Sequence, residues 1–167
     1  MALDATAGGA NANSYCTVAE ADTYHTTHLY AEDWAGAVLA KKEAALIWAT
    51  RLLDEQIAWN GDVSTQIQAL RWPRSGVLDR DGRYYFDQTL VPAFLKQAAA
   101  EFARHLLAGD RTAERSIGIT SVVADTVEVV FDKTDQKPFV PPAVRSMVEP
   151  YGELAGPGSG TARLVRV

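Results

Sequence analysis

The chain has 167 residues, of which 47% are apolar and 22% are charged, and its formal net charge at pH 7 is -5. This length and composition predict one soluble domain with a sizeable hydrophobic core. The acidic balance argues against a dedicated nucleic-acid binder, and a single cysteine, Cys16, excludes an internal disulfide and a cysteine-based zinc site.

The first 13 residues are mostly alanine, glycine and asparagine, with no basic start and no apolar run. They predict a flexible N-terminal arm that is neither a signal peptide nor an anchor. No stretch of the sequence is apolar for long enough to cross a membrane, so we expect no membrane partner.

Apolar residues at three- to four-residue spacing predict four helices. Thr17 followed by Glu20 forms a capping box, which predicts a first helix over residues 18–30. The strongest periodicity predicts a second helix over residues 38–58. Thr89 as the cap and Pro92 in the first turn predict a third helix that ends near residue 108, and a proline pair predicts a short last helix over residues 143–151.

A long connector, residues 68–87, joins the second and third helices and is rich in arginine and aromatic residues. Pro73, Gly76 and the turn signal Asp81-Gly82 stop it from continuing a helix. Guanidinium groups and rigid rings are enriched at interface hot spots, so the connector predicts a docking surface. The interface residues are Arg71, Trp72, Arg74, Arg80, Arg83, Tyr84, Tyr85 and Phe86. The alternative is a loop folded back on its own domain, with solvated arginine side chains.

Residues 116–131 change to a period of two, which predicts a β-hairpin that must pack on the helices or pair with another chain. A glycine-rich linker then precedes a short β-prone tail consisting of Arg163, Leu164, Val165, Arg166 and Val167. This order fits strand addition to a partner's sheet, and the alternative is a frayed end. The fold expected is mainly α: a small bundle of about four helices with a long inter-helix loop, a β-hairpin and extended terminal arms. The arms are residues 1–13 and 153–167, and the domain is residues 14–152.

No catalytic, metal or cofactor signature is present in the sequence. Asp79-Arg-Asp-Gly82 resembles the start of a calcium loop, but the later ligand positions hold Tyr84 and Leu90. His25 and His28 lie three residues apart without a further ligand at metal spacing. We therefore expect a protein that is not an enzyme, and a cryptic site at the three histidines, which include His105, is the weakest alternative.

The sequence resembles a family of tailed-phage proteins often described as DnaT-like single-stranded DNA-binding proteins, which look like head-to-tail connector (adaptor) proteins. The resemblance covers residues 11–110 well, and its most specific part is Trp72-Pro-Arg-Ser-Gly76. The other matching segments are Asn13-Ser-Tyr15, Thr17-Val-Ala-Glu-Ala-Asp22, Glu43-Ala-Ala-Leu46, Ala49-Thr-Arg-Leu52, Asp79-Arg-Asp-Gly82 and Val91-Pro92.

The resemblance implies a structural protein of the virion neck, assembled in the bacterial host cytoplasm. Such a protein forms a homo-oligomeric ring, typically a dodecamer matched to the portal protein, above a stopper or tail-terminator protein. Genomic double-stranded DNA passes through the channel without specific binding, which suits an acidic chain. Under this hypothesis the tail, residues 163–167, docks on the portal. The alternative is a single-stranded DNA-binding protein that uses the arginine and aromatic side chains of the connector.

Overall fold

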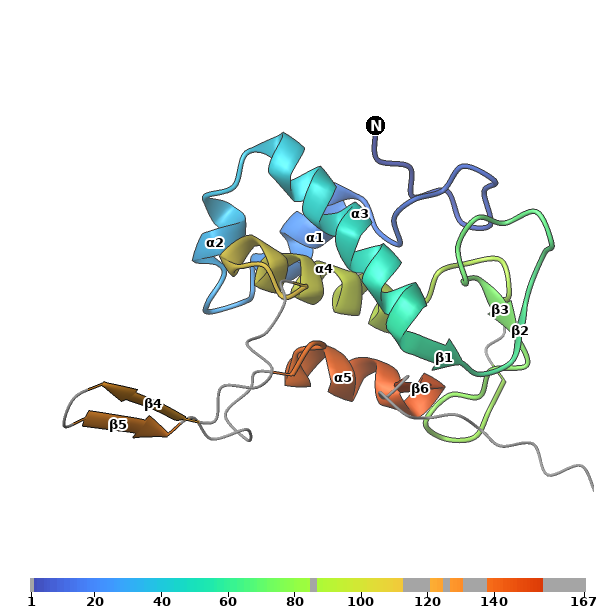
Figure 1. Cartoon of the computed structure of the whole chain (residues 1–167). Coiled ribbons are helices and arrows are strands. Elements are labelled where there is room, and N and C mark those ends of the chain that lie inside the picture. The colour runs from blue at the N-terminus through green and yellow to red at the C-terminus, as the bar shows by residue number, and fades with distance from the viewer. Residues whose placement is uncertain (1, 85–86, 113–120, 125–126, 131–137, 155–167) are drawn as a thin grey trace, which may run out of the picture.

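A computed structural model of the chain describes residues 2–84, 87–112, 121–124, 127–130 and 138–154. Within these residues, five α-helices pack together and three short two-stranded sheets accompany them (Figure 1). The mainly helical fold predicted from the sequence is confirmed. None of the helices described has both the length and the apolar character that a membrane span requires.

The first predicted helix, residues 18–30, is shorter than expected. α1 (Val18–His25) begins with the capping box predicted at Thr17 and Glu20. It ends at His25, and in the turn that follows the hydroxyls of Thr26 and Thr27 donate to the carbonyls of Asp22 and Tyr24, at 2.9 and 3.3 Å. A one-turn helix, α2 (Glu32–Ala35), follows and buries the ring of Trp34 in the core.

The second predicted helix is confirmed as α3 (Leu39–Gln56), which packs along α4. Leu46, Ala49 and Leu53, from the predicted apolar stripe, are fully buried. Leu39 is 62% exposed although its spacing continues the same apolar face, because it is the first residue of the helix and lies beyond the packed region. The exposed start of this helix forms part of the groove described below.

The central helix is α4 (Ala93–Ala108), which corresponds to the third predicted helix. Residues 98–103 are all buried, and α1, α2, α3 and α5 all contact this helix. Its cap differs from the prediction: Pro92 is the N-cap residue and no side chain caps the helix. The hydroxyl of Thr89 is instead 2.5 Å from Oδ1 of Asp87, in a turn of its own.

Two small sheets tie the ends of the helices together. β1 (Ile57–Trp59) continues α3 and pairs antiparallel with β6 (Gly152–Leu154), with Ile57 opposite Leu154. β2 (Asp62–Val63) pairs with β3 (Arg74–Ser75) inside the connector. The last predicted helix is α5 (Pro142–Val148), followed by a 3₁₀ turn, η2 (Glu149–Tyr151). Chain segments almost a hundred residues apart therefore meet at the end of α3.

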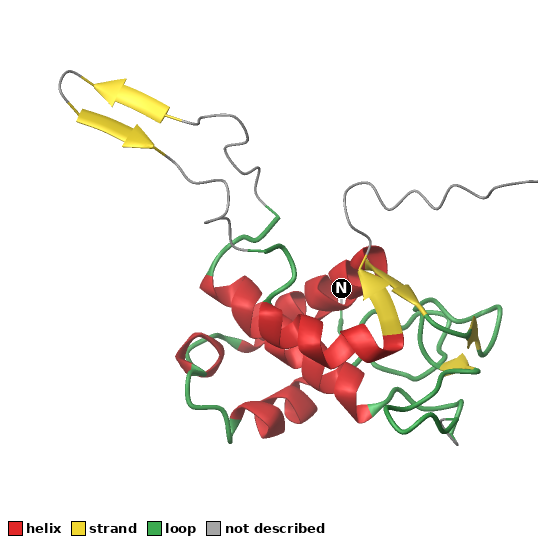
Figure 2. Cartoon of the chain, turned by 90° about the horizontal axis from the view of Figure 1, so that it is seen from below, coloured by secondary structure: helices red, strands yellow, loops and turns green. Residues whose placement is uncertain are grey.

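The predicted hairpin contains β4 (Ser121–Ala124) and β5 (Val127–Val130), paired antiparallel with Ser121 opposite Val130. The rest of the predicted hairpin, residues 116–120, 125–126 and 131, lies outside the described residues. In both views the two strands stand apart from the helical body (Figures 1 and 2).

Residues 2–13 are held against the body, in contrast with the predicted flexible arm. The carbonyl of Asp4 accepts the N–H groups of Asn13 and Ser14, at 2.8 and 3.1 Å, and Leu3 packs against the core. The N–H of Ala69 donates to the carbonyl of Gly9 at 3.1 Å, which joins this segment to the connector. The side chain of Asn13 also accepts from the N–H of Asp4, at 2.8 Å, and composition does not reveal contacts of this kind between separate parts of the segment.

Candidate interaction surface

The first part of the connector folds back on the end of α3, and Arg74 holds it there. The Nε of Arg74 donates to the carbonyl of Asn60 at 2.7 Å. Its Nη1 donates to the carbonyl of Arg71 at 3.1 Å, and its Nη2 donates to the carbonyls of Trp59, at 3.3 Å, and Gly61. Because the guanidinium is engaged by its own backbone, Arg74 is not available as the interface donor that the sequence predicted.

Trp72 is a core residue, and its prediction as an exposed interface anchor is wrong. Its side chain is 2% exposed, and the rings of Trp59 and Phe94 each meet it edge to face with centroids 5.6 Å away. Phe94 in turn stacks on Tyr151 at 3.8 Å. These four rings join the connector, β1, the start of α4 and η2. The ring of Trp72 therefore stabilises the fold and is closed to a nucleic-acid base.

A half-buried carboxylate, Asp54, anchors the same region. It accepts hydrogen bonds from the Tyr15 hydroxyl, the N–H of Arg71 at 3.0 Å and the indole N–H of Trp59 at 3.3 Å. Burial raises the pKa of Asp54, although these donors oppose the shift. Sequence analysis did not identify this role, because Asp54 is one acidic residue among several on α3 and its partners Tyr15 and Arg71 come from distant segments.

The second part of the connector presents the remaining predicted side chains to solvent. Arg71 and Arg83 are exposed, Tyr84 is 66% exposed, and Leu78 pairs with Tyr84 in a short bridge. Arg80 is also exposed, and it donates to the carbonyl of Ser146 at 3.1 Å. The other predicted residues lie outside the described residues: Tyr85, Phe86, Arg163, Leu164, Val165, Arg166 and Val167.

The three histidines of the chain gather around α4, close to a buried carboxylate, Glu101. The Nε2 atoms of His28 and His105 lie 3.4 and 3.3 Å from its two oxygens, and Nη2 of Arg104 lies 2.5 Å from Oε1. His25 is buried, and its Nε2 lies 3.2 Å from the carbonyl oxygen of Ala100, the residue that precedes Glu101.

The environment of Glu101 favours its charged form. Burial alone would raise the pKa of Glu101, but hydrogen bonds to His105 and Arg104, and the positive charge of Arg104, lower it to about 2. No group of three or more His, Cys, Asp or Glu side chains in the described residues has the geometry to hold a metal ion. The cluster fits an ion-pair network that packs α1 against α4.

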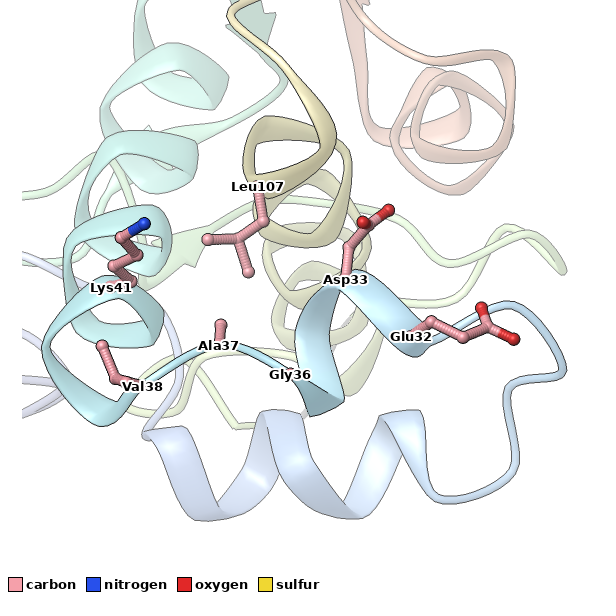
Figure 3. A pocket seen from close by; sticks show the side chains of 7 residues that line it. All are labelled: Glu32, Asp33, Gly36, Ala37, Val38, Lys41 and Leu107. Atoms are coloured by element: carbon pink, nitrogen blue, oxygen red, sulfur yellow. The ribbon is translucent and has the colours of Figure 1, made fainter.

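An open groove of about 360 Å³ lies beside the start of α3 (Figure 3). Leu107 of α4 points into it, Val38 and Lys41 line the side formed by the start of α3, and Asp33 of α2 borders it. Val38 is 64% exposed. Sequence analysis did not identify this groove, because its lining comes from α2, the start of α3 and the end of α4, which are separate in the sequence.

Comparison with protein families identifies the chain. All residues, 1–167, match the family model described as "Putative DnaT-like ssDNA binding protein". The chain belongs to this family. The DnaT-like resemblance is therefore confirmed, and it extends to both terminal arms. No curated protein and no solved structure matches the chain. The family description supports single-stranded DNA binding, and the connector role in a phage neck stays a prediction.

Proposed function

We propose that this DnaT-like family member is a structural head-to-tail adaptor of a tailed phage, one that forms a ring between the portal and the stopper or tail. The observation that carries the proposal is the hairpin of β4 and β5, which stands apart from the helical body. Two strands alone are marginally stable in water, and their outer edges can pair with strands of another chain. A hairpin of this kind favours a protein that completes its structure in an assembly.

The acidic charge of the chain also supports this proposal. A net charge of -5 disfavours tight binding of the DNA that passes through a channel. The burial of Trp72 and the backbone contacts of Arg74 remove one aromatic ring and one guanidinium from the surface predicted to bind bases. The proposed role is structural, located in the virion neck, and requires no catalysis and no cofactor.

Single-stranded DNA binding is the second candidate, and it is the one that the family description supports. The exposed side chains of Arg71, Arg83 and Tyr84 could neutralise phosphates and stack on a base. Binding of this kind depends steeply on salt because phosphate contacts release counterions.

The two candidates are separated by mass measurements and by DNA binding. We expect the purified chain to join the portal protein of the same phage in a ring-sized complex by light scattering on a sizing column. Removal of residues 156–167 should abolish this complex and leave the helical circular dichroism signal unchanged. A chain that ignores the portal, yet binds a single-stranded oligonucleotide with roughly micromolar affinity and a steep salt dependence, would establish the second candidate instead.

A further inference from the structure

His25, the last residue of α1, connects three helices. Its ring lies 4.9 Å, centroid to centroid, from the ring of Trp34 in α2. Its Nε2 lies 3.2 Å from the carbonyl oxygen of Ala100 in α4. The residue is only 5% exposed, and α1 and α2 both contact α4 (Figure 1). A change in the state of this imidazole therefore acts on both contacts with α4.

The hydrogen bond of His25 fixes where its proton lies. A carbonyl oxygen only accepts, so Nε2 carries the proton and Nδ1 has a lone pair in the neutral ring. Nδ1 is buried, and no hydrogen-bond partner for it lies among the described residues. Protonation would add an N–H group at Nδ1 that has no acceptor. Both the unpaired donor and the buried charge would cost free energy in the folded state.

On the side of α2 and α3, the one nearby carboxylate is already compensated. Asp22 accepts from Nζ of Lys42 and from the indole N–H of Trp34, both at 2.8 Å. The Nζ of Lys42 also lies 5.1 Å from the ring centroid of Trp34. A positive charge on His25 would thus meet a ring that already faces a cation and a carboxylate that already has a counter-charge.

The same is true on the side of α4. Glu101 is 2.5 Å from Nη2 of Arg104, and its oxygens also lie 3.4 and 3.3 Å from Nε2 of His28 and His105. Glu101 attracts a charge on His25, whereas Arg104 repels it, as does His28 when protonated. The surroundings therefore provide no free anion for a protonated His25.

We propose that His25 is a pH-sensitive switch: its neutral ring holds residues 18–35, the corner segment, against α4, and its protonation detaches this segment before the rest of the protein unfolds. The corner segment contains only the eight residues of α1 and the four of α2, so it has less packing to lose than α3 with its 18 residues. Because Glu32 and Asp33 line the groove of Figure 3, detachment would also change the groove. This inference is independent of the proposed function.

The direction of the pH effect follows from the state of the ring. Burial lowers the pKa of His25 from 6.5, although the hydrogen bond to Ala100 and the charge of Glu101 oppose the shift. In a detached segment the ring meets water and its pKa returns to about 6.5. The closed form is therefore fully favoured above this value, and it loses stability as the pH falls below it. For one such group, the detached population rises at most about tenfold between about pH 7.5 and 5.5.

Amide hydrogen exchange of the full chain, followed by mass spectrometry, tests the switch. Rates are divided by the intrinsic chemical rates at each pH, so that they report the opening equilibrium. We expect the corner segment to be less protected than residues 45–53 of α3 throughout, and its opening to increase several-fold from about pH 7.5 to 5.5. Opening that does not change with pH would overturn the switch. Equal protection of the two segments would also overturn it, because only global unfolding would then expose His25.

Three variants assign the response to one imidazole. His25→Gln keeps an N–H group for the carbonyl of Ala100, His25→Phe keeps a ring beside Trp34, and neither side chain titrates. Opening of the corner segment should be independent of pH in both. The matched control is His105→Gln, which removes a 25% exposed imidazole of the same cluster and should keep the wild-type response. A response that persists without His25, or that disappears with His105, would overturn the assignment.

A measurement on the wild type keeps the test independent of how well the variants fold. The ring resonances of His25, followed by NMR over the same pH range, report when this imidazole gains a proton. Proton uptake should coincide with the loss of protection in the corner segment. A ring that becomes protonated near its usual pKa of about 6.5 while protection is unchanged would show that the closed form accepts the charge, and would overturn the switch.

Discussion

The guanidinium of Arg74 donates a 2.7 Å hydrogen bond to the backbone carbonyl of Asn60. This contact joins the connector to the turn that follows β1, and three further carbonyls accept from the same side chain. One arginine thus satisfies backbone acceptors that a loop would otherwise leave to water. The Trp-Pro-Arg-Ser-Gly motif owes its shape to this side chain and to the buried ring of Trp72.

Replacement of Arg74 by alanine should lower the free energy of unfolding by about 2–3 kcal/mol, because several hydrogen bonds from a charged donor are lost together. Arg83→Ala is the matched control: its side chain is exposed, and we expect a change within about 0.5 kcal/mol. Urea unfolding monitored by tryptophan fluorescence measures both. Equal effects of the two substitutions would show that the contacts of Arg74 do not stabilise the connector.

Gly61 is required by the packing of the connector as well as by its own backbone. Its φ is +70°, and a Cβ there would lie 2.2 Å from the carbonyl oxygen of Ser75. Gly82 has a φ of +75° with open space around the Cβ position. Gly82→Ala should therefore cost only the conformational penalty of about 1–2 kcal/mol, and Gly61→Ala should cost clearly more. Thermal unfolding of the two variants measures the difference, and similar melting temperatures would contradict the close approach seen at Gly61.

Local signals predicted the helices well because their causes lie within a few residues. Thr17 and Glu20 cap α1 reciprocally through their own side chains, and the spacing of Leu46, Ala49 and Leu53 alone places them on one face of α3. The hairpin was found for the same reason, since alternation is a property of consecutive residues.

The candidate surface was predicted less well because its structure depends on distant partners. Arg71 and Trp72 are adjacent in sequence, but Arg71 is exposed and Trp72 is buried. Trp72 is buried because the rings of Trp59 and Phe94, from other segments, pack against it. The sequence does contain a local signal for the ion pairs of Glu101. This residue interrupts an apolar helix face and precedes Arg104 and His105 by three and four residues.

Replacement of Glu101 by glutamine should destabilise the protein by about 3 kcal/mol, because it leaves the half-buried guanidinium of Arg104 without its counter-charge. Glu149→Gln removes a carboxylate from an exposed pair with Arg145 and should change stability by less than about 0.5 kcal/mol. Guanidinium or urea titrations of both variants give the comparison. A small effect at Glu101 would mean that the ion-pair network contributes little net stability.

The lowered pKa of Glu101 also predicts how stability depends on pH. A carboxyl group whose pKa falls from 4.5 unfolded to about 2 folded stabilises the protein above the unfolded value, and this contribution is lost as pH falls toward 2. The shift corresponds to roughly 3 kcal/mol. The wild type should therefore lose more stability than Glu101→Gln between about pH 5 and pH 2, since other carboxylates such as Glu20 are common to both. Parallel pH profiles for the two proteins would contradict this assignment.

Val38→Asp should stabilise the folded protein. Val38 is the N-cap residue of α3, has an extended backbone with φ -70° and ψ 154°, and caps no N–H group with its side chain. Aspartate in this position can accept from the N–H groups of the first turn and complements the helix dipole, a gain of about 1 kcal/mol. Little apolar burial is lost, because the valine is 64% exposed. A higher melting temperature than that of the wild type would confirm that the N-cap position of α3 lacks a side-chain acceptor that aspartate supplies. A lower melting temperature would instead mean that Val38 contributes to the core of the subunit.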